Sequence, residues 1–170
     1  MAVGEPGGAP PSGRTLVLGL GNPLLSDDAA GLAVAKEFER LLAERPIPGV
    51  EVVTSSRGGF ELIDLLTGFE RAVIVDALIT DDPHPGRVHR LEPGQVAGSA
   101  RLVGSHDIGL ADALELAGEL GIAMPATVTV LGVEAADLTT FAETLTPAVA
   151  EAVVRLAGEL HESLARGEHS

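Results

Sequence analysis

The sequence contains no cysteine. This absence excludes disulfide bonds, thiol nucleophiles and thiolate metal sites, so any metal must bind to oxygen and nitrogen ligands. Basic residues are also few, 11 against 25 acidic ones, and the formal net charge is −14. Because nucleic-acid binding draws most of its affinity from cationic side chains that neutralise phosphates, this charge argues against nucleic acid as a partner.

Long apolar runs are absent as well, and none approaches the roughly 18 residues that a membrane span requires. The first segment, MAVGEPGGAPPSGR, has neither a basic start nor an apolar stretch, so we expect no secretory signal, no membrane partner and a cytoplasmic location. Its glycine and proline content predicts a disordered extension over residues 1–13. The remaining composition indicates one globular domain over residues 14–165, with a flexible tail at 166–170.

Apolar strand-like runs alternate with helical patterns along the chain. Strands are expected at Thr15–Leu20, Val50–Thr54, Ala72–Ala77 and Thr127–Val133, with an exposed edge strand at Gly86–Leu91. Helices are expected at Asp27–Glu44, at Phe60–Phe69, along the stripe Ile108, Ala111, Leu114, Ala117 and Leu120 before Gly121, and from Thr146 as N-cap with Pro147 at the first position. This order predicts a single three-layer α/β/α domain, with a mostly parallel twisted sheet of about five strands and helices on both faces.

Ionisable residues recur where the predicted strands end, and open α/β sheets bind their ligands beyond those carboxyl ends. Asp27 and Asp28 follow the first strand in LVLGLGNPLLSDDAAG. Asp76 ends the third strand, and His106 precedes the next helix. If these ends converge, two carboxylates and an imidazole suit a divalent transition metal. Local physics offers a second interpretation, with Ser26 as a helix N-cap and both aspartates favoured by the helix dipole.

Other motifs fit the sequence less well. GLGN resembles the start of a dinucleotide fingerprint, but Leu24 occupies the place of the third glycine and two aspartates would repel a pyrophosphate. Ser105, His106 and Asp107 are contiguous, whereas the side chains of a catalytic triad converge from separate positions. His84 and His89 flank a turn with proline and glycine, where we expect solvent exposure.

Four segments carry a family resemblance: LVLGLGNPLLSDDAAGLAVAKEFE, RAVIVDALIT, HDIGLADALELAGELG, and VTVLGVE followed by LTPAVAEAV. In this order, over roughly residues 16–160, they resemble the nickel–iron hydrogenase maturation endopeptidases. The resemblance implies removal of the C-terminal extension of a hydrogenase large-subunit precursor once nickel has been inserted. It therefore implies this precursor as partner and nickel, carried by the substrate, as the metal, with zinc or cadmium able to occupy the site in isolation.

The resemblance also implies the metal ligands. The nickel-contacting positions of the family correspond to Asp28, Asp76 and His106, which are also the candidate catalytic residues, while Asp27 matches an acidic position that is not a ligand. The sequence does not choose between a metal that polarises the scissile carbonyl or activates a water and a carboxylate that acts as general base. The assignment as an aspartic-type or a metal-dependent peptidase therefore stays open.

One loop departs from the family pattern. After the second strand, where members commonly have D-G-G-T, this chain has residues 54–57 (TSSR) before Gly58 and Gly59. Because that loop is tied in the family to recognition of the large subunit, we expect Arg57, Gly58 and Gly59 to bind substrate. The glycine that many members have directly before L-S/T-P is Thr144 here.

Two other functions are compatible with parts of the sequence. The altered loop allows a non-catalytic nickel-sensing module, or chaperone, that docks on the hydrogenase precursor without cutting it. GLGNP also opens the peptidyl-tRNA hydrolases, which have a related α/β sheet. Those enzymes continue with R-H-N-x-G, however, and the net charge of −14 opposes a tRNA partner.

Overall fold

The structure is a computed structural model that describes residues 13–95, 100–102 and 109–168. Its sheet has the strand order β2-β1-β3-β6-β4, and β5 pairs with β3 beside this path. The first four of these strands are mutually parallel, whereas β4 and β5 run antiparallel to their neighbours. The strands are β1 (Thr15–Leu20), β2 (Val50–Ser55), β3 (Arg71–Thr80), β4 (Val88–Leu91), β5 (Ala100–Leu102) and β6 (Thr127–Glu134).

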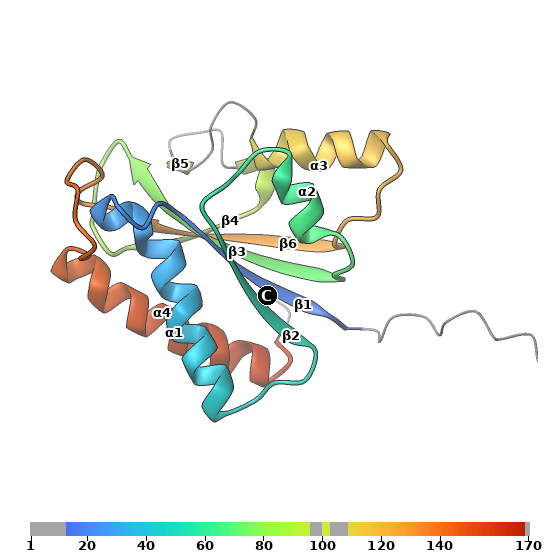
Figure 1. Cartoon of the computed structure of the whole chain (residues 1–170), viewed down its shortest axis with the longest axis horizontal. Coiled ribbons are helices and arrows are strands. Elements are labelled where there is room, and N and C mark those ends of the chain that lie inside the picture. Colours follow the sequence, from blue (N-terminus) through green and yellow to red (C-terminus); the bar gives the residue numbers. More distant parts are fainter. Residues whose placement is uncertain (1–12, 96–99, 103–108, 169–170) are drawn as a thin grey trace, which may run out of the picture.

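Helices cover both faces of the sheet (Figure 1). The first pair packs on one face: α1 (Ala30–Glu44), preceded by the 3₁₀ turn η1 (Ser26–Ala29), and α4 (Pro147–Ala165). The other face carries α2 (Glu61–Leu66) and α3 (Leu110–Glu119), and the short 3₁₀ turn η2 (Pro93–Gln95) follows β4. The predicted three-layer α/β/α fold with a mostly parallel sheet is thereby confirmed, and β4 is the expected edge strand.

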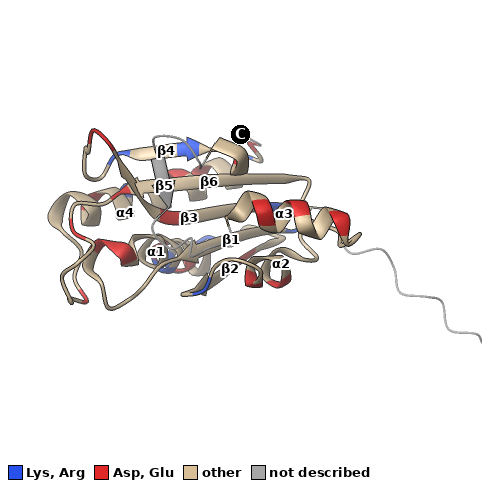
Figure 2. Cartoon of the chain, turned by 90° about the horizontal axis from the view of Figure 1, so that it is seen from above, with Lys and Arg blue, Asp and Glu red and all other residues tan. Residues whose placement is uncertain are grey.

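The core follows from the alternation of side chains along the central strands. In β1, Val17 points into the cluster formed with α1 and α4, whereas Leu16 and Leu18 point into the cluster beneath α2 and α3. All six residues of β1 are buried, which is why its sequence is continuously apolar rather than alternating. Acidic residues recur along α2 and α3 (Figure 2), and they are exposed whereas the buried residues of these helices are apolar, so both helices are amphipathic. Within the described part of the chain, no helix is long and apolar enough to cross a bilayer.

Strand β3 is longer than the sequence suggested. It continues to Thr80, so Asp76 lies inside the strand and does not end it as predicted. The reason is the pairing on both sides. Strand β1 pairs with β3 as far as Val75, after which β5 pairs with Leu78–Thr80, while β6 continues alongside as far as Glu134. Asp76 consequently lies just beyond the last residue that β1 covers.

Helix α3 lies where it was predicted, but the prediction of which of its residues face the core was partly wrong. The buried residues are Leu110, Ala113 and Ala117, whereas Ala111 is exposed. This segment has apolar residues on neighbouring stripes, and packing of Ala113 and Ala117 against Ile63 of α2 selects the buried one. Ile108 lies outside the described residues. The predicted end is confirmed, because Gly121 has φ +68° and its amide and that of the next residue donate to carbonyls of the last turn, as in a Schellman motif.

The other helices lie where they were predicted, but α1 begins at Ala30 rather than Asp27 and α2 ends at Leu66 rather than Phe69. The expected inward residues Ile63 and Leu66 of α2 are buried, and so is the α4 stripe of Val149, Val153, Leu156 and Leu160. Most of the extension predicted over residues 1–13 lies outside the described residues.

Glycine at position 31 sets the place of α1 relative to the sheet. A Cβ atom built on Gly31 would lie 2.2 Å from the carbonyl oxygens of both Leu20 and Val75. Only a residue without a side chain therefore lets the first turn of α1 rest directly on the end of β1 and the middle of β3. This close approach brings η1 into contact with β3 at the carboxyl edge of the sheet.

Candidate active site

The segment between β1 and α1 differs from the predicted helix start. Residues 26–29 form the 3₁₀ turn η1, and Ser26 has a positive φ of 29°. The Ser26 hydroxyl donates to the carbonyl oxygen of Thr144 at 3.1 Å, and no side chain caps the start of η1 or α1. The prediction that Ser26 is the N-cap was therefore wrong, because a carbonyl from a distant loop binds its hydroxyl.

Asp27 is completely buried and accepts hydrogen bonds from a segment more than 100 positions away. Its Oδ2 accepts from the amides of Ala136 and Asp137 at 2.8 and 2.9 Å, and its Oδ1 accepts from the amide of Thr146 at 2.8 Å. The Thr146 hydroxyl donates to the same carboxylate. Asp27 thus ties η1 to both ends of the β6–α4 loop (residues 135–146). It binds the N-cap residue of α4 and does not cap its own helix, which corrects the helix-dipole interpretation.

Asp28 is also buried, with 7% of its surface exposed. Its carbonyl oxygen accepts from the amide of Asn22 at 3.3 Å, and a Cβ on Gly21 would lie 2.1 Å from that oxygen, so the backbone here is closely packed. Asp28 lines a groove of about 690 Å³, hereafter the Asp28 groove. Its other lining residues are Leu20, Gly21, Asn22, Pro23, Leu24, Leu25, Ser56, Arg57 and Leu138.

The predicted substrate-binding residues follow β2, and one of the three lines the Asp28 groove. Arg57 lines the Asp28 groove, and its mostly exposed guanidinium donates to Glu61 at 3.0 Å. Gly58 and Gly59 follow in the turn before α2, where Gly59 has φ +67°, and they are not among the groove's lining residues. The groove is therefore lined by one predicted metal ligand, Asp28, and by one predicted substrate-binding residue, Arg57.

Asp76 lies in β3 with 1% of its surface exposed, and its Oδ1 accepts from the amide of Ala77 at 2.8 Å. Since η1 contacts β3, the elements that carry Asp28 and Asp76 meet at one edge of the sheet. His106 lies outside the described residues. Among residues 13–95, 100–102 and 109–168, no group of three or more histidine and acidic side chains is placed to hold a metal, and the predicted ligand set extends beyond these residues through His106.

A buried carboxylate that the sequence analysis did not single out ends β6. Glu134 is 1% exposed, accepts from the Thr80 hydroxyl and lies 3.3 Å from Nε2 of His89. Burial raises the pKa of Glu134, but the Thr80 hydrogen bond and the His89 ring outweigh it, and the pKa lies below its usual value. His84 is exposed as expected, whereas the expectation for His89 was wrong because Glu134 holds its ring partly buried. The sequence feature that indicated the Glu134–His89 contact was a carboxylate directly after the apolar run TVTVLGV.

The acidic groups of this edge make stability depend on pH. The Thr140 hydroxyl and the amides of Thr139 and Thr140 hold the pKa of Asp137 at about 2, below its ordinary 3.8. Because the folded-state pKa is lower than the unfolded one, Asp137 stabilises the fold above about pH 4, and this contribution is lost as the pH falls toward 2. We expect urea unfolding measured between pH 5 and pH 2 to show a smaller loss of stability for Asp137→Asn than for the unmodified protein. The matched control, Asp64→Asn on the exposed side of α2, should keep the original slope; equal slopes for all three proteins would contradict the assignment.

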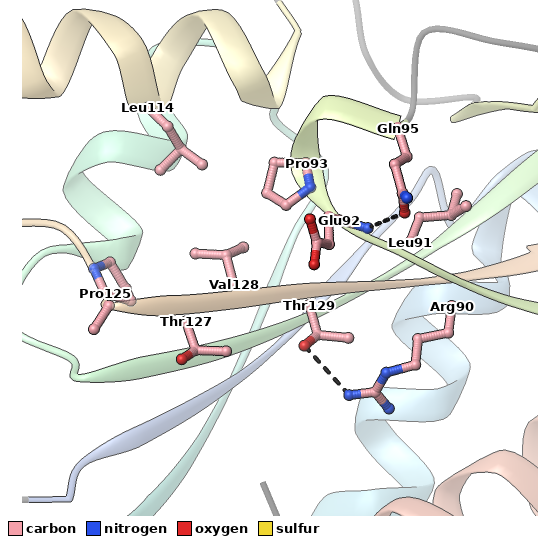
Figure 3. Close-up of a pocket in the computed structure, with 11 residues that line it drawn as sticks. Arg90, Leu91, Glu92, Pro93, Gln95, Leu114, Pro125, Thr127, Val128 and Thr129 are labelled. Carbon is pink, nitrogen blue, oxygen red and sulfur yellow. Dashed lines mark hydrogen bonds between the residues drawn. The ribbon is translucent and has the colours of Figure 1, made fainter. Parts of the chain in front are cut away.

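A second hollow of about 600 Å³ lies at the opposite end of β6 (Figure 3). It is bounded by the start of β6, the end of β4 with η2, and Leu114 of α3. Arg90 donates to the Thr129 hydroxyl at 3.4 Å across its edge. Because ligands of open α/β sheets bind beyond the carboxyl ends of the parallel strands, this hollow at the amino end of β6 is separate from the candidate site.

Fold and site together define a class of protein. A doubly wound sheet with three buried aspartates and a groove at its carboxyl edge has the ligand position of α/β enzymes. The family model described as "Hydrogenase maturation protease" matches residues 32–163, and the chain belongs to this family. It is accordingly a peptidase, and hydrogenase maturation proteases act on precursors of hydrogenase large subunits. The family predicted from the four sequence segments is confirmed.

Individual relatives agree with this assignment. The chain is 32% identical over 125 residues to the hydrogenase 2 maturation protease of Escherichia coli K12, covering 71% of this chain and 72% of the relative. The structure resembles the hydrogenase maturating endopeptidase HybD from E. coli, with a TM-score of 0.72, 28% identity, and 91% and 93% of the two chains covered. It also resembles the NiFe hydrogenase maturation protease HybD from Thermococcus kodakarensis, with a TM-score of 0.66, 31% identity, and 89% and 99% covered.

Proposed function

We propose that this protein removes the C-terminal extension of a nickel–iron hydrogenase large-subunit precursor, and that it recognises the nickel already bound there through Asp28, Asp76 and His106. The observation that carries the proposal is the meeting of η1 and β3. Three buried aspartates lie on these contacting elements, Asp27 and Asp28 on η1 and Asp76 on β3, and Asp28 lines a groove of about 690 Å³. Pockets of this size hold molecules comparable to a short peptide.

The chemistry of the residues supports nickel. Carboxylate and imidazole are ligands that divalent nickel accepts, and the chain has no thiolate to compete with them. Two carboxylates on contacting elements attract a divalent cation. Asp28 and Asp76 therefore favour the nickel-loaded precursor over the empty one.

Two routes to cleavage fit this arrangement. The nickel can polarise the scissile carbonyl or lower the pKa of a bound water toward about 7. Alternatively, one aspartate can act as general base for the attacking water. In both routes the substrate's own metal brings the scissile bond to the carboxylates, so a precursor without nickel is a poor substrate.

The direct test uses the purified protein and a precursor large subunit from the same genome, loaded with nickel or free of it. We expect loss of the C-terminal extension, seen by intact mass, only from the nickel-loaded precursor. Equal cleavage of both forms would contradict nickel recognition. Binding without cleavage of any cognate precursor would favour the non-catalytic nickel-sensing module, which the altered loop at residues 54–57 keeps under consideration.

A further inference from the structure

Two large apolar side chains are unusually exposed beside the Asp28 groove. Phe141, in the β6–α4 loop, is 83% exposed, and Leu24, in the segment before η1, is 53% exposed. The chain contains only four phenylalanines, and exposing one of them almost fully forgoes the stabilisation that its burial would give. Exposed apolar groups that gather beside a groove mark binding surfaces more often than scattered ones do.

The backbone holds these two residues side by side. The amide of Ala142 donates to the carbonyl of Leu24 at 3.2 Å, and the amide of Ser26 donates to the carbonyl of Ala142 at 2.9 Å. Leu25 forms isolated β-bridges with Phe141 and Ala142. The two segments therefore run together as a short paired rim, which we call the Leu24–Phe141 rim.

The exposure of Phe141 is built into the loop. Asp27 fixes both ends of the β6–α4 loop through the amides of Ala136, Asp137 and Thr146. Inside the loop, Oδ1 of Asp137 accepts from the amides of Thr139 and Thr140 at 2.9 and 3.0 Å. These hydrogen bonds hold the backbone that carries Phe141, which lowers the entropy cost of binding a partner there.

The rim is continuous with the candidate active site. Leu24 itself lines the Asp28 groove, and Leu138 of the β6–α4 loop lines it as well. The groove wall is otherwise mainly apolar, with Asp28 and Arg57 as its charged residues. A chain segment that leaves the groove over Leu24 meets Phe141 in the paired segment beside it.

We infer that the Leu24–Phe141 rim binds an extended, apolar segment of the hydrogenase precursor next to the scissile bond. This inference rests on the proposed function and adds the substrate feature that the rim selects. A groove of about 690 Å³ accepts a few residues of extended peptide and is too small for a folded domain. The acidic side chains of Asp137 and Glu143 in the same loop favour a segment without acidic residues of its own.

The test compares Leu24→Ser, Phe141→Ser and their double variant with Val154→Ser as matched control. Val154 is 62% exposed on α4, so its replacement removes a similar exposed apolar group away from the rim. Binding of the nickel-loaded precursor is measured by biolayer interferometry, and processing is measured by intact mass. We expect each rim variant to weaken binding about tenfold and to raise KM with little change in kcat, because the rim does not touch the reacting atoms. Val154→Ser should stay within twofold, and all variants should keep the melting temperature.

The outcomes separate this inference from the proposed function. Weaker binding of the rim variants supports the inference even if no protein in the series cuts the precursor, in which case the proposed cleavage fails alone. Rim variants that bind and process within twofold of the unmodified protein overturn the inference and leave the cleavage intact. Sedimentation analysis tests whether the rim instead binds a second copy of this chain. A dimer that Phe141→Ser converts to a monomer would assign the rim to self-association and overturn the inference as well.

Discussion

Asp76→Asn is expected to abolish processing of the nickel-loaded precursor while leaving the fold in place. Asparagine keeps a side-chain oxygen that can accept the hydrogen bond from the Ala77 amide, which Oδ1 of Asp76 accepts at 2.8 Å. It removes the negative charge that the proposed nickel contact requires. Mutation of a residue that only supports a metal ligand typically lowers metal affinity or activity about 10–100-fold. Loss of a ligand itself should therefore reduce kcat/KM by at least about 100-fold.

The measurement is the rate of loss of the C-terminal extension, with thermal unfolding of each variant in parallel. Asp28→Asn and His106→Ala test the other two proposed ligands, and Asp64→Asn on the exposed side of α2 is the control that removes an acidic charge away from the site. A second readout, nickel binding by the isolated proteins, separates loss of metal contact from general damage. Processing by Asp76→Asn at the unmodified rate, with the fold intact, would exclude Asp76 from the site.

Asp27→Ala is expected to lower the free energy of unfolding by about 3 kcal/mol, the largest stability effect at this edge. Hydrogen bonds to a charged group contribute about 1.5–3 kcal/mol each, and unsatisfied donors add a desolvation cost. Three amides and one hydroxyl lose their acceptor together, although partial access of water to the loop reduces the sum. Asp27→Asn should recover little of the stability lost in Asp27→Ala. Both oxygens of Asp27 accept hydrogen bonds, and the asparagine NH₂ group would face amide donors.

Urea unfolding at neutral pH measures this effect, and Asp64→Ala provides the exposed comparison. Hydrogen exchange adds a local measurement: the amides of Ala136, Asp137 and Thr146 should lose protection in Asp27→Ala, while those of β1 and β3 keep theirs at low denaturant. An Asp27→Ala protein as stable as the unmodified one would mean that the loop is held by other contacts.

Much of the fold was predictable because its signals are local. The continuous apolar runs of β1 and β3 reflect burial on both faces, and Pro147 after Thr146 marks the start of α4 through the fixed φ of proline. Gly121 likewise marks the end of α3 by its positive φ. The length of β3 was missed because it depends on β5 and β6, whose pairing with β3 no local pattern specifies.

The candidate site divides in the same way. The sequence singled out Asp28, Asp76 and Arg57, and the structure brings Asp28 and Arg57 to one groove and Asp76 to an adjoining element. The role of Asp27 could not be predicted, because its partners lie in a loop more than 100 residues later. The partial burial of His89 was missed for a similar reason, since the turn beside it suggests exposure and only Glu134 across the sheet opposes this.

The bonds between Asp27 and Thr146 also impose an order on biosynthesis. Asp27 leaves the ribosome early, whereas the last of its donors, Thr146, is the N-cap residue directly before the last helix. Contacts of such long sequence separation form late in folding. A nascent chain that has completed all six strands therefore still lacks the Thr146 donors to Asp27, and premature termination before residue 146 also removes α4 and its share of the core.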